Sequence, residues 1–430
     1  MADKLSTQPY KGTRDFYPED MRFRRWMFGH LRQAVESYGY QEYDGPLLEP
    51  FDLYASKTSE EIVSQQLYWL VDRGERKMAI RPEMTPTLAR MVAGKLQDLP
   101  KPIRWYSLPN LWRYERPQRG RLREHWQLNV DVLGGDRLQG DAEILAVAGS
   151  IFEAFGGSEL VRIKINNRKF LDHVFRQTCG LADEATLAVT RLLDEYFKLG
   201  AEAFSAKLGG LGLSPDQIAE VVSYTELGRR GIAGLSESKY ASEGGRELVE
   251  LLAHLDSKTF EFDPCIVRGF QYYTGTVFEA YDVSPENTRA LFGGGRYDNL
   301  IGLFGKQQLS GVGFGLGDVS LQNFLETHKL VPTLGSGVDV LVTNPGPEKR
   351  AKAQQVLRQL RASGFRAATT LDYSGFGKQI QSAVKLGARF VVLLGDEELG
   401  RGEVGVKNLA SGGQASVREE TLVEFLRSDR

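Results

Sequence analysis

The spacing of hydrophobic and polar positions predicts a helix followed by strands in the N-terminal part of the chain. Apolar residues recur at helical spacing from about residue 20 to residue 38, in MRFRRWMFGHLRQAVESYG, and Gly39 ends the pattern. The next stretch, YQEYDGPLLEPFDLY, is strand-like. Its two prolines, Pro46 and Pro50, are typical of an edge or interface strand.

Further strand-like segments follow this first pair. LYWLVD and RKMAIRPE predict a hairpin around Asp72–Glu75. IRWYSLPNLWRYE and HWQLNVDVLGG predict two strands on either side of a polar, arginine-rich loop. Because a run of strands with few crossover helices favours antiparallel pairing, we expect an antiparallel sheet.

The pattern becomes helical between residues 166 and about 255, which predicts a helical insertion within the first domain. The helical segments are LADEATLAVTRLLDEYFKLG, SPDQIAEVVSYTELG and GGRELVELLAHL. Strand-like sequence returns in CIVRGFQYYTGTVFEAYDV. After FGGGRYDNL, the segment GVGFGLGDVSLQNFL predicts a glycine-alternating strand that runs into a helix.

A linker, VPTLGSG at residues 331–337, separates a first domain at 1–330 from a second at 338–430. In the second domain VDVLVTN predicts a strand and PEKRAKAQQVLRQLRASG a helix with proline at its start and Gly364 at its end. The same alternation continues through RFVVLLG, which predicts a small α/β domain with parallel strands. EVGVKNLASGGQASVRE predicts a hairpin before a last helix.

Composition narrows the possible partners. The formal net charge is −2 and 41% of residues are hydrophobic, an ordinary globular balance. A nucleic acid must therefore meet a local basic patch, because the chain has no overall basic field. The two cysteines, Cys179 and Cys265, give no disulfide framework or zinc spacing, and the five histidines show no paired ligand spacing, so we expect no structural metal.

We expect the protein in the cytoplasm. The sparse thiols fit a reducing compartment. The N-terminal MADKLSTQPYKGTRD lacks the apolar core of a signal peptide. No stretch approaches the roughly 18 apolar residues that a membrane helix requires, so we expect no membrane partner.

Three segments are rich in residues whose side chains could bind a ligand or take part in catalysis. The first holds five arginines within the eleven residues 113–123, on the loop between two predicted strands. Guanidinium groups suit phosphate oxygens, and Gly120 allows close backbone approach, so we favour phosphate binding over a solvated basic loop. In the second, Arg268 precedes Tyr272 and Tyr273. That segment fits an anion clamp and a cross-strand aromatic pair equally well.

The third segment is glycine-rich. Gly311, Gly313, Gly315 and Gly317 recur with period two, so one face of this strand lacks side chains. A flat ligand such as a purine ring fits such a face, and tight packing of the sheet is the alternative. The chain has neither a Walker loop nor a dinucleotide fingerprint, so any nucleotide binds on an antiparallel sheet.

In this order the segments resemble the motifs of the histidyl-tRNA synthetase family of class II aminoacyl-tRNA synthetases. KGTRDFYPED resembles the N-terminal signature, GYQEYDGPLLEP motif 1 and RPEMTPTLAR the RPEGT segment. RYERPQRGRLREHWQLNVDVLG resembles motif 2, and VRGFQYYTGTVFE and GGGRYDNL resemble the two histidine-specific motifs. GVGFGLGDVSL occupies the place of motif 3, and GKQIQSAVKLGARFVVLLGDEEL and VKNL resemble the anticodon-binding domain.

The resemblance implies an α+β catalytic domain with an antiparallel sheet and a helical insertion, followed by an α/β anticodon-binding domain. It implies that the carboxylate of histidine attacks the α-phosphorus of ATP, giving histidyl-adenylate and pyrophosphate. The terminal ribose hydroxyl of tRNA(His) then takes the histidyl group. Mg²⁺ would accompany ATP, and the protein would contribute mainly positioning and positive charge.

Roles at the ATP site follow from matching positions to the family's motifs. Arg113 is expected to hold the α-phosphate, Glu115 the amino edge of adenine, and Arg121 or Arg123 the γ-phosphate. Arg268 would stabilise charge on the α-phosphate and the carboxylate, so Arg113 and Arg268 are the expected catalytic residues. The residues expected to contact ATP are Arg113, Glu115, Arg121, Arg123, His125, Arg268, Gly313 and Gly315.

Roles at the histidine site follow in the same way. Glu83 and Thr85, assisted by Gln127, would hold the α-ammonium group, and Asp131 and Tyr273 would read the two imidazole nitrogens. Such a site rejects amino acids that lack the imidazole, so no editing domain is needed. The residues expected to bind histidine are Glu83, Thr85, Gln127, Asp131, Tyr272, Tyr273 and Tyr297.

Several positions depart from the family's pattern. Val319 and Ser320 stand where motif 3 usually has a glutamate–arginine pair whose arginine grips the γ-phosphate. His125 replaces a phenylalanine that stacks on adenine, and an imidazole can also stack. Smaller departures are Asp131 for glutamate, Gln271 for aspartate and Met84 for glycine.

The resemblance also names macromolecular partners. Arg116 and Gln118, on the motif 2 loop, are the expected contacts to the acceptor stem, and the C-terminal domain is expected to read unstacked anticodon bases. Motif 1 implies a homodimer. The alternative is a catalytically inactive, histidine-binding regulatory subunit of histidine biosynthesis, which the altered motif 3 favours and the retained Arg113, Arg268 and residues 338–430 oppose.

Overall fold

The computed structural model describes residues 5–55, 62–228, 231, 235, 238–267, 273–305, 308–335 and 337–428. The chain forms two compact units. One consists of Met1–Phe16 with Arg24–Val331, and the other of Tyr17–Phe23 with Pro332–Arg430. No helix among the described residues is long and apolar enough to cross a membrane.

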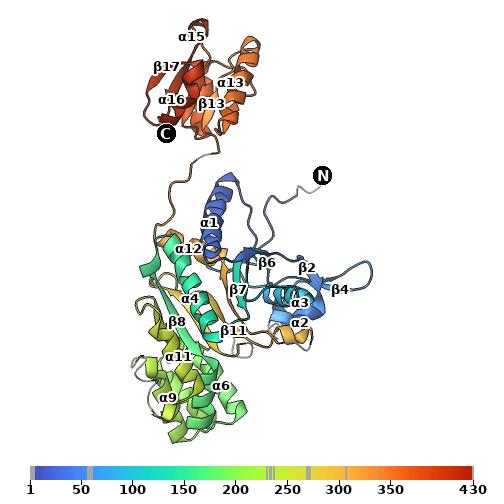
Figure 1. Cartoon of the computed structure of the whole chain (residues 1–430), viewed down its shortest axis with the longest axis vertical. Coiled ribbons are helices and arrows are strands. Elements are labelled where there is room, and N and C mark those ends of the chain that lie inside the picture. Colours follow the sequence, from blue (N-terminus) through green and yellow to red (C-terminus); the bar gives the residue numbers. More distant parts are fainter. Residues whose placement is uncertain are drawn as a thin grey trace. The chain divides into compact units, whose positions relative to one another are not determined.

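The first unit is built on a sheet of nine described strands, in the order β1-β5-β7-β12-β11-β10-β8-β9, with β6 beside β7 (Figure 1). All neighbours pair antiparallel except β1 with β5 and β8 with β9. The predicted antiparallel sheet is confirmed for its central strands, and the two parallel pairs at its ends make it mixed. The strands are β1 Gln41–Glu42, β5 Ile103–Ser107, β6 Asn110–Trp112, β7 Glu124–Leu133, β8 Val161–Asn167, β9 Phe260–Phe262, β10 Thr276–Asp282, β11 Ala290–Tyr297 and β12 Gly311–Gly317.

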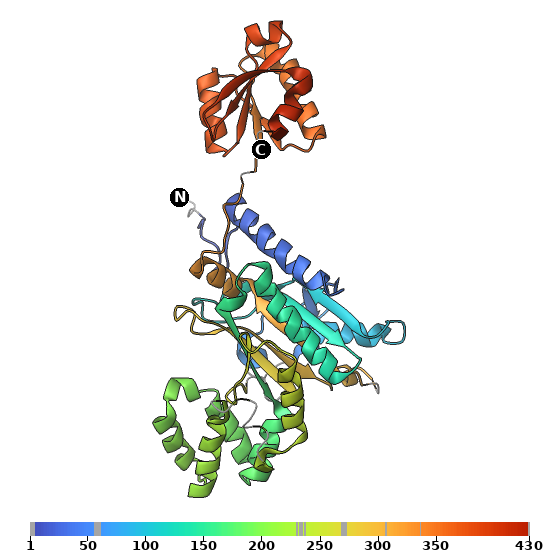
Figure 2. The ribbon, with the colours of Figure 1, turned by 60° about the vertical axis from the view of Figure 1, so that its left-hand side comes forward.

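Helices cover one face of this sheet because each central strand presents apolar side chains to it. On β7 these are Leu128, Val130 and Val132, all at most 3% exposed. Helices α4 (Arg137–Ala154) and α12 (Asp318–Thr327) pack against β7 and β12, and Figure 2 shows α4 lying across the strands. The other face of the same strands is left to polar residues and glycine.

A smaller sheet of three strands holds the predicted hairpin, which is confirmed. Strands β3 (Trp69–Val71) and β4 (Lys77–Ile80) pair antiparallel, and β2 (Leu48–Pro50) pairs with β4. In the turn, Asp72 Oδ1 accepts hydrogen bonds from the amides of Gly74 (2.8 Å) and Arg76 (2.9 Å). The strand-like stretch after residue 40 is only partly extended, since Phe51–Ala55 forms helix α2. Helix α3 (Thr85–Lys95) contacts α2. Helix α1 (Pro18–Glu36) belongs to the region of the main sheet, where its Trp26 and His30 pack on Phe155 at the end of α4.

The helical insertion is confirmed, although residues 166 and 167 belong to β8 of the main sheet. Helix α9 begins with a capping box, in which Ser214 and Gln217 bond each other's backbone, because Ser-Pro-X-Gln places a hydroxyl and an amide three residues apart. Tyr224 at its far end lies 3.1 Å from Asn166 of β8 and joins the insertion to the sheet. The described helices are α5 Arg168–His173, α6 Asp183–Leu193, α7 Tyr196–Leu199, α8 Ala201–Gly210, α9 Pro215–Thr225 and α11 Glu243–Ala253.

The second unit contains a five-stranded sheet in the order β14-β13-β15-β16-β17. Strands β14, β13 and β15 are parallel, and β16 and β17 form the predicted hairpin. The alternating strand–helix prediction is therefore confirmed. Its elements are β13 Val340–Val342, α13 Arg350–Ala362, β14 Ala367–Thr369, α14 Phe376–Lys385, β15 Phe390–Leu393, α15 Asp396–Gly400, β16 Glu403–Asn408, β17 Gln414–Arg418 and α16 Leu422–Ser428.

Candidate active site

Strand β7 carries a polar row on the face of the sheet opposite the helices. Because successive side chains of a strand point to opposite faces, His125, Gln127, Asn129 and Asp131 share one face while Leu128 and Val130 face the core. The Gln127 amide Nε2 donates to Asn129 Oδ1 at 2.7 Å. Asn129 and Asp131 are each only 4% exposed, so this row is a buried polar surface. The sequence shows the alternation, yet Asn129 was not among the expected site residues.

Glycines on β12 make room for that row. A Cβ atom added to Gly313 would lie 2.1 Å from Asp131 Oδ1, and one on Gly315 would lie 2.2 Å from Gln127 Nε2. A Cβ on Gly311 would lie 2.6 Å from the ring of Tyr297. The space above these glycines is therefore filled by side chains of the neighbouring strands, which is a different reason for glycine than a purine ring lying flat on them. Contact of Gly313 and Gly315 with ATP stays a prediction.

Asp131 lies at the buried end of this polar row. The Tyr297 hydroxyl donates a hydrogen bond to Asp131 Oδ1. Burial raises the pKa of the Asp131 carboxyl to about 7, and the hydrogen bond from Tyr297 offsets part of that rise. The side chain is therefore close to half protonated near neutral pH, and it can accept or donate one hydrogen bond.

Tyr273 joins this group from the chain segment before β10. Its ring lies over Gly295, where an added Cβ would come within 2.8 Å of the ring carbon Cδ1. Gly295 pairs with Gly313, above which the Asp131 carboxylate lies. Three of the residues expected to bind histidine, Asp131, Tyr273 and Tyr297, are thus brought together from three different segments of the chain.

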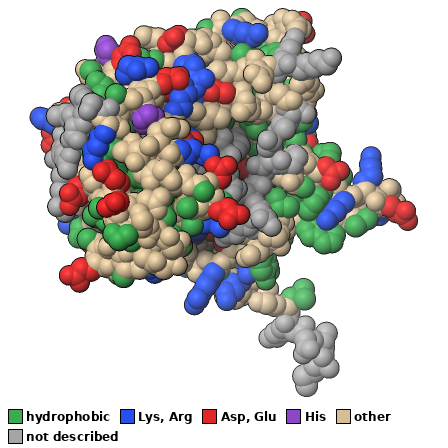
Figure 3. Space-filling view, turned by 90° about the horizontal axis from the view of Figure 1, so that it is seen from below, with side chains coloured by type: hydrophobic (Ala, Val, Ile, Leu, Met, Phe, Trp, Pro, Cys, Tyr) green, Lys and Arg blue, Asp and Glu red, His purple; other side chains and the backbone are tan. Residues whose placement is uncertain are grey.

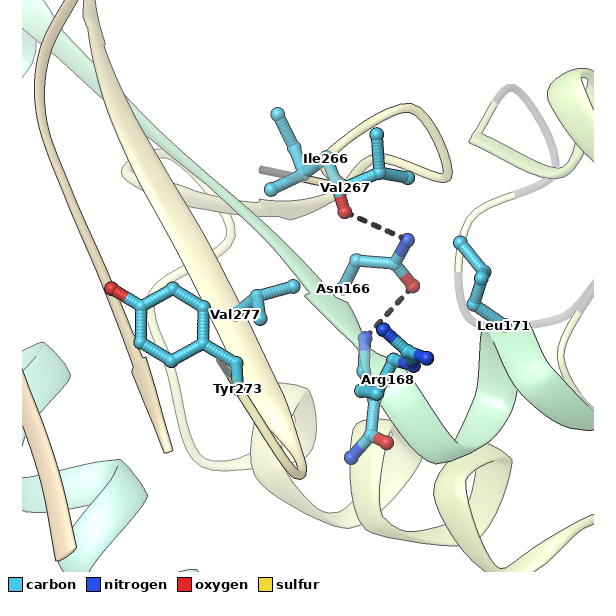
Figure 4. Close-up of a pocket in the computed structure, with 8 residues that line it drawn as sticks. Asn166, Arg168, Leu171, Ile266, Val267, Tyr273 and Val277 are labelled. Atoms are coloured by element: carbon cyan, nitrogen blue, oxygen red, sulfur yellow. Dashed lines mark hydrogen bonds between the residues drawn. The ribbon is translucent and has the colours of Figure 1, made fainter. Parts of the chain in front are cut away.

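A small cavity next to Tyr273 is lined by β8, β10 and the chain that leads to residue 268 (Figure 4). Asn166 Nδ2 lies 3.1 Å from the carbonyl oxygens of both Pro264 and Ile266, so β8 holds this chain in place. Arg268 and Tyr272, both expected at the site, lie outside the described residues, as does Gln271.

The arginine-rich loop forms the second part of the site. The Arg113 Nε donates to the carbonyl of Pro82 at 2.9 Å, which joins this loop to the segment that holds Glu83. Glu115 lies 4.0 Å from Arg113 and 3.5 Å from Arg121, and its side chain is 12% exposed. A half-buried acid between two guanidinium groups can accept hydrogen bonds from a base or balance the charge of a phosphate site.

The tip of this loop is a tight turn. Gln118 and Arg121 exchange backbone hydrogen bonds of 3.0 and 2.9 Å, and Gly120 has a φ of +78°, which suits glycine. Arg116 and Gln118 are exposed at the turn, and Gln118 accepts from Arg289 at 3.0 Å. Arg123 is engaged within the protein: its Nη1 donates to the Tyr10 hydroxyl at 2.6 Å.

Glu83 and Thr85 flank the start of α3 and are half-buried. Met84 between them is fully buried and packs with Leu88 and Tyr43, so this departure from glycine adds to the core. The buried Arg81 fixes the segment by donating to Asp44 and to the Gly45 carbonyl, both at 2.7 Å. Asp44 and Gly45 belong to the stretch that resembles motif 1.

His125 begins the polar row of β7. Burial, followed by the charges of Arg113 and Arg14, lowers the pKa of its imidazole to about 3. The ring is therefore neutral at physiological pH and presents an uncharged aromatic face. Its Nδ1 atom is buried and has no hydrogen-bond partner in the described part of the chain.

A buried ion pair supports β11 from the helical side of the sheet. Arg296 bonds Asp141 of α4 through Nη2 (2.7 Å) and Nε (2.9 Å), and Thr276 of β10 donates to the other Asp141 oxygen at 2.7 Å. Arg296 and Tyr297 are neighbours on the strand, so this pair positions the strand that carries Tyr297. Within the described ranges, no group of three or more His, Cys, Asp or Glu residues is arranged to hold a metal ion.

Known proteins of one family match this chain over almost its whole length. A family model described as Histidyl-tRNA synthetase matches residues 12–318, and a model described as Anticodon binding domain matches residues 338–429. The chain is 44% identical over 417 residues to the histidine–tRNA ligase of Leptospira biflexa, covering 96% of this chain and 95% of that protein. It is 37% identical over 427 residues to the histidine–tRNA ligase of Thermoplasma volcanium, covering 98% and 99%.

A solved structure shows the same fold. The crystal structure of histidyl-tRNA synthetase from Nostoc sp. PCC 7120 aligns with a TM-score of 0.86 at 27% identity, covering 99% of this chain and 100% of that one. The sequence match, the fold and the buried polar face lead to one conclusion. This chain belongs to the histidyl-tRNA synthetase family of class II aminoacyl-tRNA synthetases.

Proposed function

We propose that this chain activates L-histidine with ATP and transfers it to the 3′ end of tRNA(His). The observation that carries the proposal is the meeting of Asp131, Tyr273 and Tyr297 on one face of the sheet, over the glycines of β11 and β12. Sequence relatives that the chain covers almost completely are histidine–tRNA ligases, and the anticodon-binding domain is retained. The alternative of an inactive regulatory subunit is not favoured.

The imidazole of histidine is recognised by the buried polar groups around Asp131. An imidazole N–H donates to the Asp131 carboxylate, and the hydroxyl of Tyr273 meets the second ring nitrogen. Tyr297 holds the carboxylate in position, and Tyr272 completes the pocket. An amino acid without the imidazole would leave buried polar groups unpaired, which can cost on the order of 10⁴-fold in specificity.

The α-ammonium group of histidine lies between the half-buried Glu83 and Thr85 at the start of α3, with Gln127 on the floor. The contact between Arg113 and the Pro82 carbonyl supports this arrangement, since it brings the residue assigned to the α-phosphate next to the segment assigned to the amino acid. The histidine carboxylate then lies near the α-phosphorus, which is the positioning that the reaction requires.

ATP binds at the arginine-rich loop. Glu115 accepts from the adenine amino group, the neutral ring of His125 stacks on the base, and Arg113 and Arg268 hold the α-phosphate. Arg121 is the better of the two candidates for the γ-phosphate, because Arg123 is packed on Tyr114 at 4.0 Å and bonded to Tyr10. Gly313 and Gly315 contribute to the site indirectly, because they leave the room that the side chains of Asp131 and Gln127 occupy.

In the first step a histidine carboxylate oxygen forms a bond to the α-phosphorus while the bond to the bridging oxygen breaks, releasing pyrophosphate. In the second step the terminal ribose hydroxyl of the tRNA attacks the activated carbonyl, and AMP leaves. Both steps build negative charge on phosphate oxygens, so arginine side chains stabilise them without covalent participation.

Mg²⁺ would accompany ATP. The described residues offer no cluster of three or more acidic or histidine ligands, so the phosphates and water would supply most of its coordination, as is usual for this ion. When bound, it would neutralise phosphate charge.

The tRNA contacts both domains of the chain. Arg116 and Gln118 are exposed at the turn of the arginine-rich loop and would meet the acceptor stem. Residues 338–430 would read the anticodon, and residues 1–330, with the helical insertion, would carry the reaction. The ranges that the two family models match support this assignment of roles to the two domains.

The protein acts as a homodimer in the cytoplasm. Support for the dimer is an exposed apolar surface on the three-stranded sheet, which we call the hairpin patch. Figure 3 shows hydrophobic side chains gathered on the projecting β3–β4 hairpin. The hairpin patch consists of Leu47, Leu48, Trp69, Leu70 and Val71, which are between 39% and 57% exposed. Leu48 and Leu70 lie on one face of the small sheet, and Trp69 and Val71 on the other. A second copy that packs around the hairpin would remove these side chains from water. The two buried free thiols, Cys179 and Cys265, fit a reducing compartment.

The test is ATP–pyrophosphate exchange with purified protein, Mg²⁺ and each amino acid in turn. Exchange that depends on histidine alone establishes the activation step, and charging of tRNA(His) establishes the second. Histidine binding without exchange would refute the proposal and point to a regulatory role. Exchange with a different amino acid would refute the assignment of the Asp131 pocket to imidazole.

A further inference from the structure

The first turn of α12 lacks a cation of its own. Ser320 and Val319 occupy the positions where motif 3 usually carries its arginine and glutamate. The Ser320 hydroxyl lies 3.5 Å from the carbonyl of Gly120, so this turn of α12 faces the turn of the arginine-rich loop. A residue that serves the phosphates of ATP at this place must come from another part of the chain.

Arg14 reaches the start of α12 from the N-terminal segment. Its Nη2 donates to Asp318 Oδ2 at 2.7 Å, and Asp318 Oδ1 accepts from the amide of Trp126 at 3.0 Å. Asp318 is 4% exposed, so its carboxylate is held by β7 on one side and by the guanidinium on the other. The Arg14 side chain keeps 22% of its surface exposed and can still be reached by a ligand.

The segment that carries Arg14 runs along the end of the arginine-rich loop. The Gly12 carbonyl accepts from the amides of Arg123 (2.9 Å) and Glu124 (3.2 Å). The Tyr10 hydroxyl accepts from Arg123 Nη1 at 2.6 Å. The N-terminal segment is therefore part of the wall of the proposed ATP site.

Two buried nitrogen atoms in this wall lack partners. Arg14 Nε and His125 Nδ1 have no hydrogen-bond partner among the described residues. The charge of Arg14 also contributes to the lowered pKa of His125. A buried N–H without an acceptor is costly, and a phosphate oxygen is a strong acceptor for a guanidinium group.

We propose that Arg14, oriented by Asp318, is the guanidinium that contacts the β- and γ-phosphates of ATP at the start of α12. It takes the place of an arginine at position 320. The inference rests on the proposed function and adds a residue to it. Arg14 neutralises charge on the pyrophosphate as its bond to the α-phosphorus breaks, and no proton is transferred.

The experiment compares the binding of ATP and AMP to the full-length protein by calorimetry, together with pyrophosphate exchange. Arg14→Gln removes the charge but keeps a side-chain donor for Asp318, which protects the fold. It should weaken ATP binding by about 10- to 100-fold. AMP binding and the KM for histidine should change less than about twofold, because neither depends on the β- and γ-phosphates. Arg14→Lys should recover part of the ATP affinity.

Arg24→Gln is the matched control. The Arg24 guanidinium lies 4.4 Å from the rings of both Phe16 and Trp126. We expect it to make no contact with the phosphates. Its ATP affinity should equal that of the wild type. Equal weakening of ATP and AMP in Arg14→Gln would overturn the proposal and leave Arg14 as a structural tether. Unchanged ATP affinity would overturn it as well.

The two proposals fail in different ways. If the wild type binds ATP but exchanges pyrophosphate with no amino acid, the proposed activity fails, while the ATP-to-AMP comparison still decides the role of Arg14. If histidine-dependent exchange occurs and Arg14→Gln retains the wild-type KM for ATP, only the role of Arg14 fails.

Discussion

The hydroxyl of Tyr297 on β11 donates to the carboxylate of Asp131 on β7, across the glycine strand β12 that lies between them. The contact joins two of the segments that were expected to recognise histidine. It exists because Gly311 and Gly313 leave the space above β12 open.

Tyr297→Phe should therefore weaken histidine recognition more than ATP binding. The change removes one donor to a buried carboxylate, which costs roughly 1–3 kcal/mol, so the KM for histidine should rise by about tenfold or more. The KM for ATP should stay within about twofold of the wild type. Steady-state exchange kinetics measure both. An equal rise in the two constants would mean that Tyr297 supports the whole site.

Histidine activation should depend on a group that titrates near pH 7. Burial raises the pKa of Asp131 to about 7. Below that pH the carboxyl is protonated and no longer accepts from the imidazole N–H, so kcat/KM for histidine should fall. Asp131→Asn should have a lower but flatter profile. Free histidine titrates near pH 6.5 and affects both proteins equally. The ratio of the wild-type kcat/KM to the variant kcat/KM at each pH therefore reports the titration of Asp131 alone. A ratio that does not vary with pH would contradict the prediction.

The raised pKa of Asp131 should also make the stability of the protein depend on pH. Because the pKa of Asp131 is raised in the folded state above its unfolded value of about 3.9, its contribution favours folding fully below that value and is lost as pH rises through about 7. Asp131→Asn should therefore melt higher than the wild type at pH 8, by a margin that shrinks at pH 5. Differential scanning calorimetry of both proteins at the two pH values tests the sign.

Gly313→Ala should damage the site, while Gly317→Ala on the same strand should not. A Cβ on residue 313 would lie 2.1 Å from Asp131 Oδ1 and 2.6 Å from the Val130 carbonyl, whereas one on residue 317 meets nothing within 4 Å. We expect Gly313→Ala to lose about 1–3 kcal/mol of stability and most histidine affinity. Urea unfolding and exchange kinetics test both variants, and equal behaviour would contradict the packing argument.

His125 should contact the adenine of ATP as an uncharged ring. Its pKa of about 3 keeps the imidazole uncharged from pH 5 to pH 8, so the ATP affinity should carry no titration from this residue in that range. His125→Phe should keep or improve ATP binding, and His125→Ala should weaken it by about 1–3 kcal/mol if the ring stacks on adenine. Phe and Ala variants with the same affinity would exclude stacking.

The hairpin patch should hold two copies together. Val71→Asp places a charge on its most exposed residue, 57% exposed, and should shift the protein from dimer to monomer in analytical ultracentrifugation. Leu211→Glu is the control, since Leu211 is 41% exposed in the helical insertion, away from this sheet. A wild type that is already monomeric would remove the case for the dimer, and dissociation by both variants would show a non-specific effect.

Much of the architecture was readable from local pattern. The strand that became β7 was predicted from HWQLNVDVLGG, and the helical spacing between residues 166 and about 255 indicated the insertion. The arginine-rich loop between two strands was also predicted, because it depends on neighbouring residues, whereas the tight turn at Gly120 was seen only in the structure. The five-residue helix Phe51–Ala55 was missed, since a single turn has too few positions to show a period.

The sequence by itself thus determined the order of elements, the two domains' type of fold and the residues of the histidine-specific motifs, because each depends on spacing along the chain. The tertiary structure decided which of them meet. Asp131 and Tyr297 are 166 residues apart, and Arg14 and Asp318 are 304 residues apart. Only the register of β7, β12 and β11 shows that glycines accommodate site side chains, since that fit depends on neighbours across the sheet, which no local period encodes.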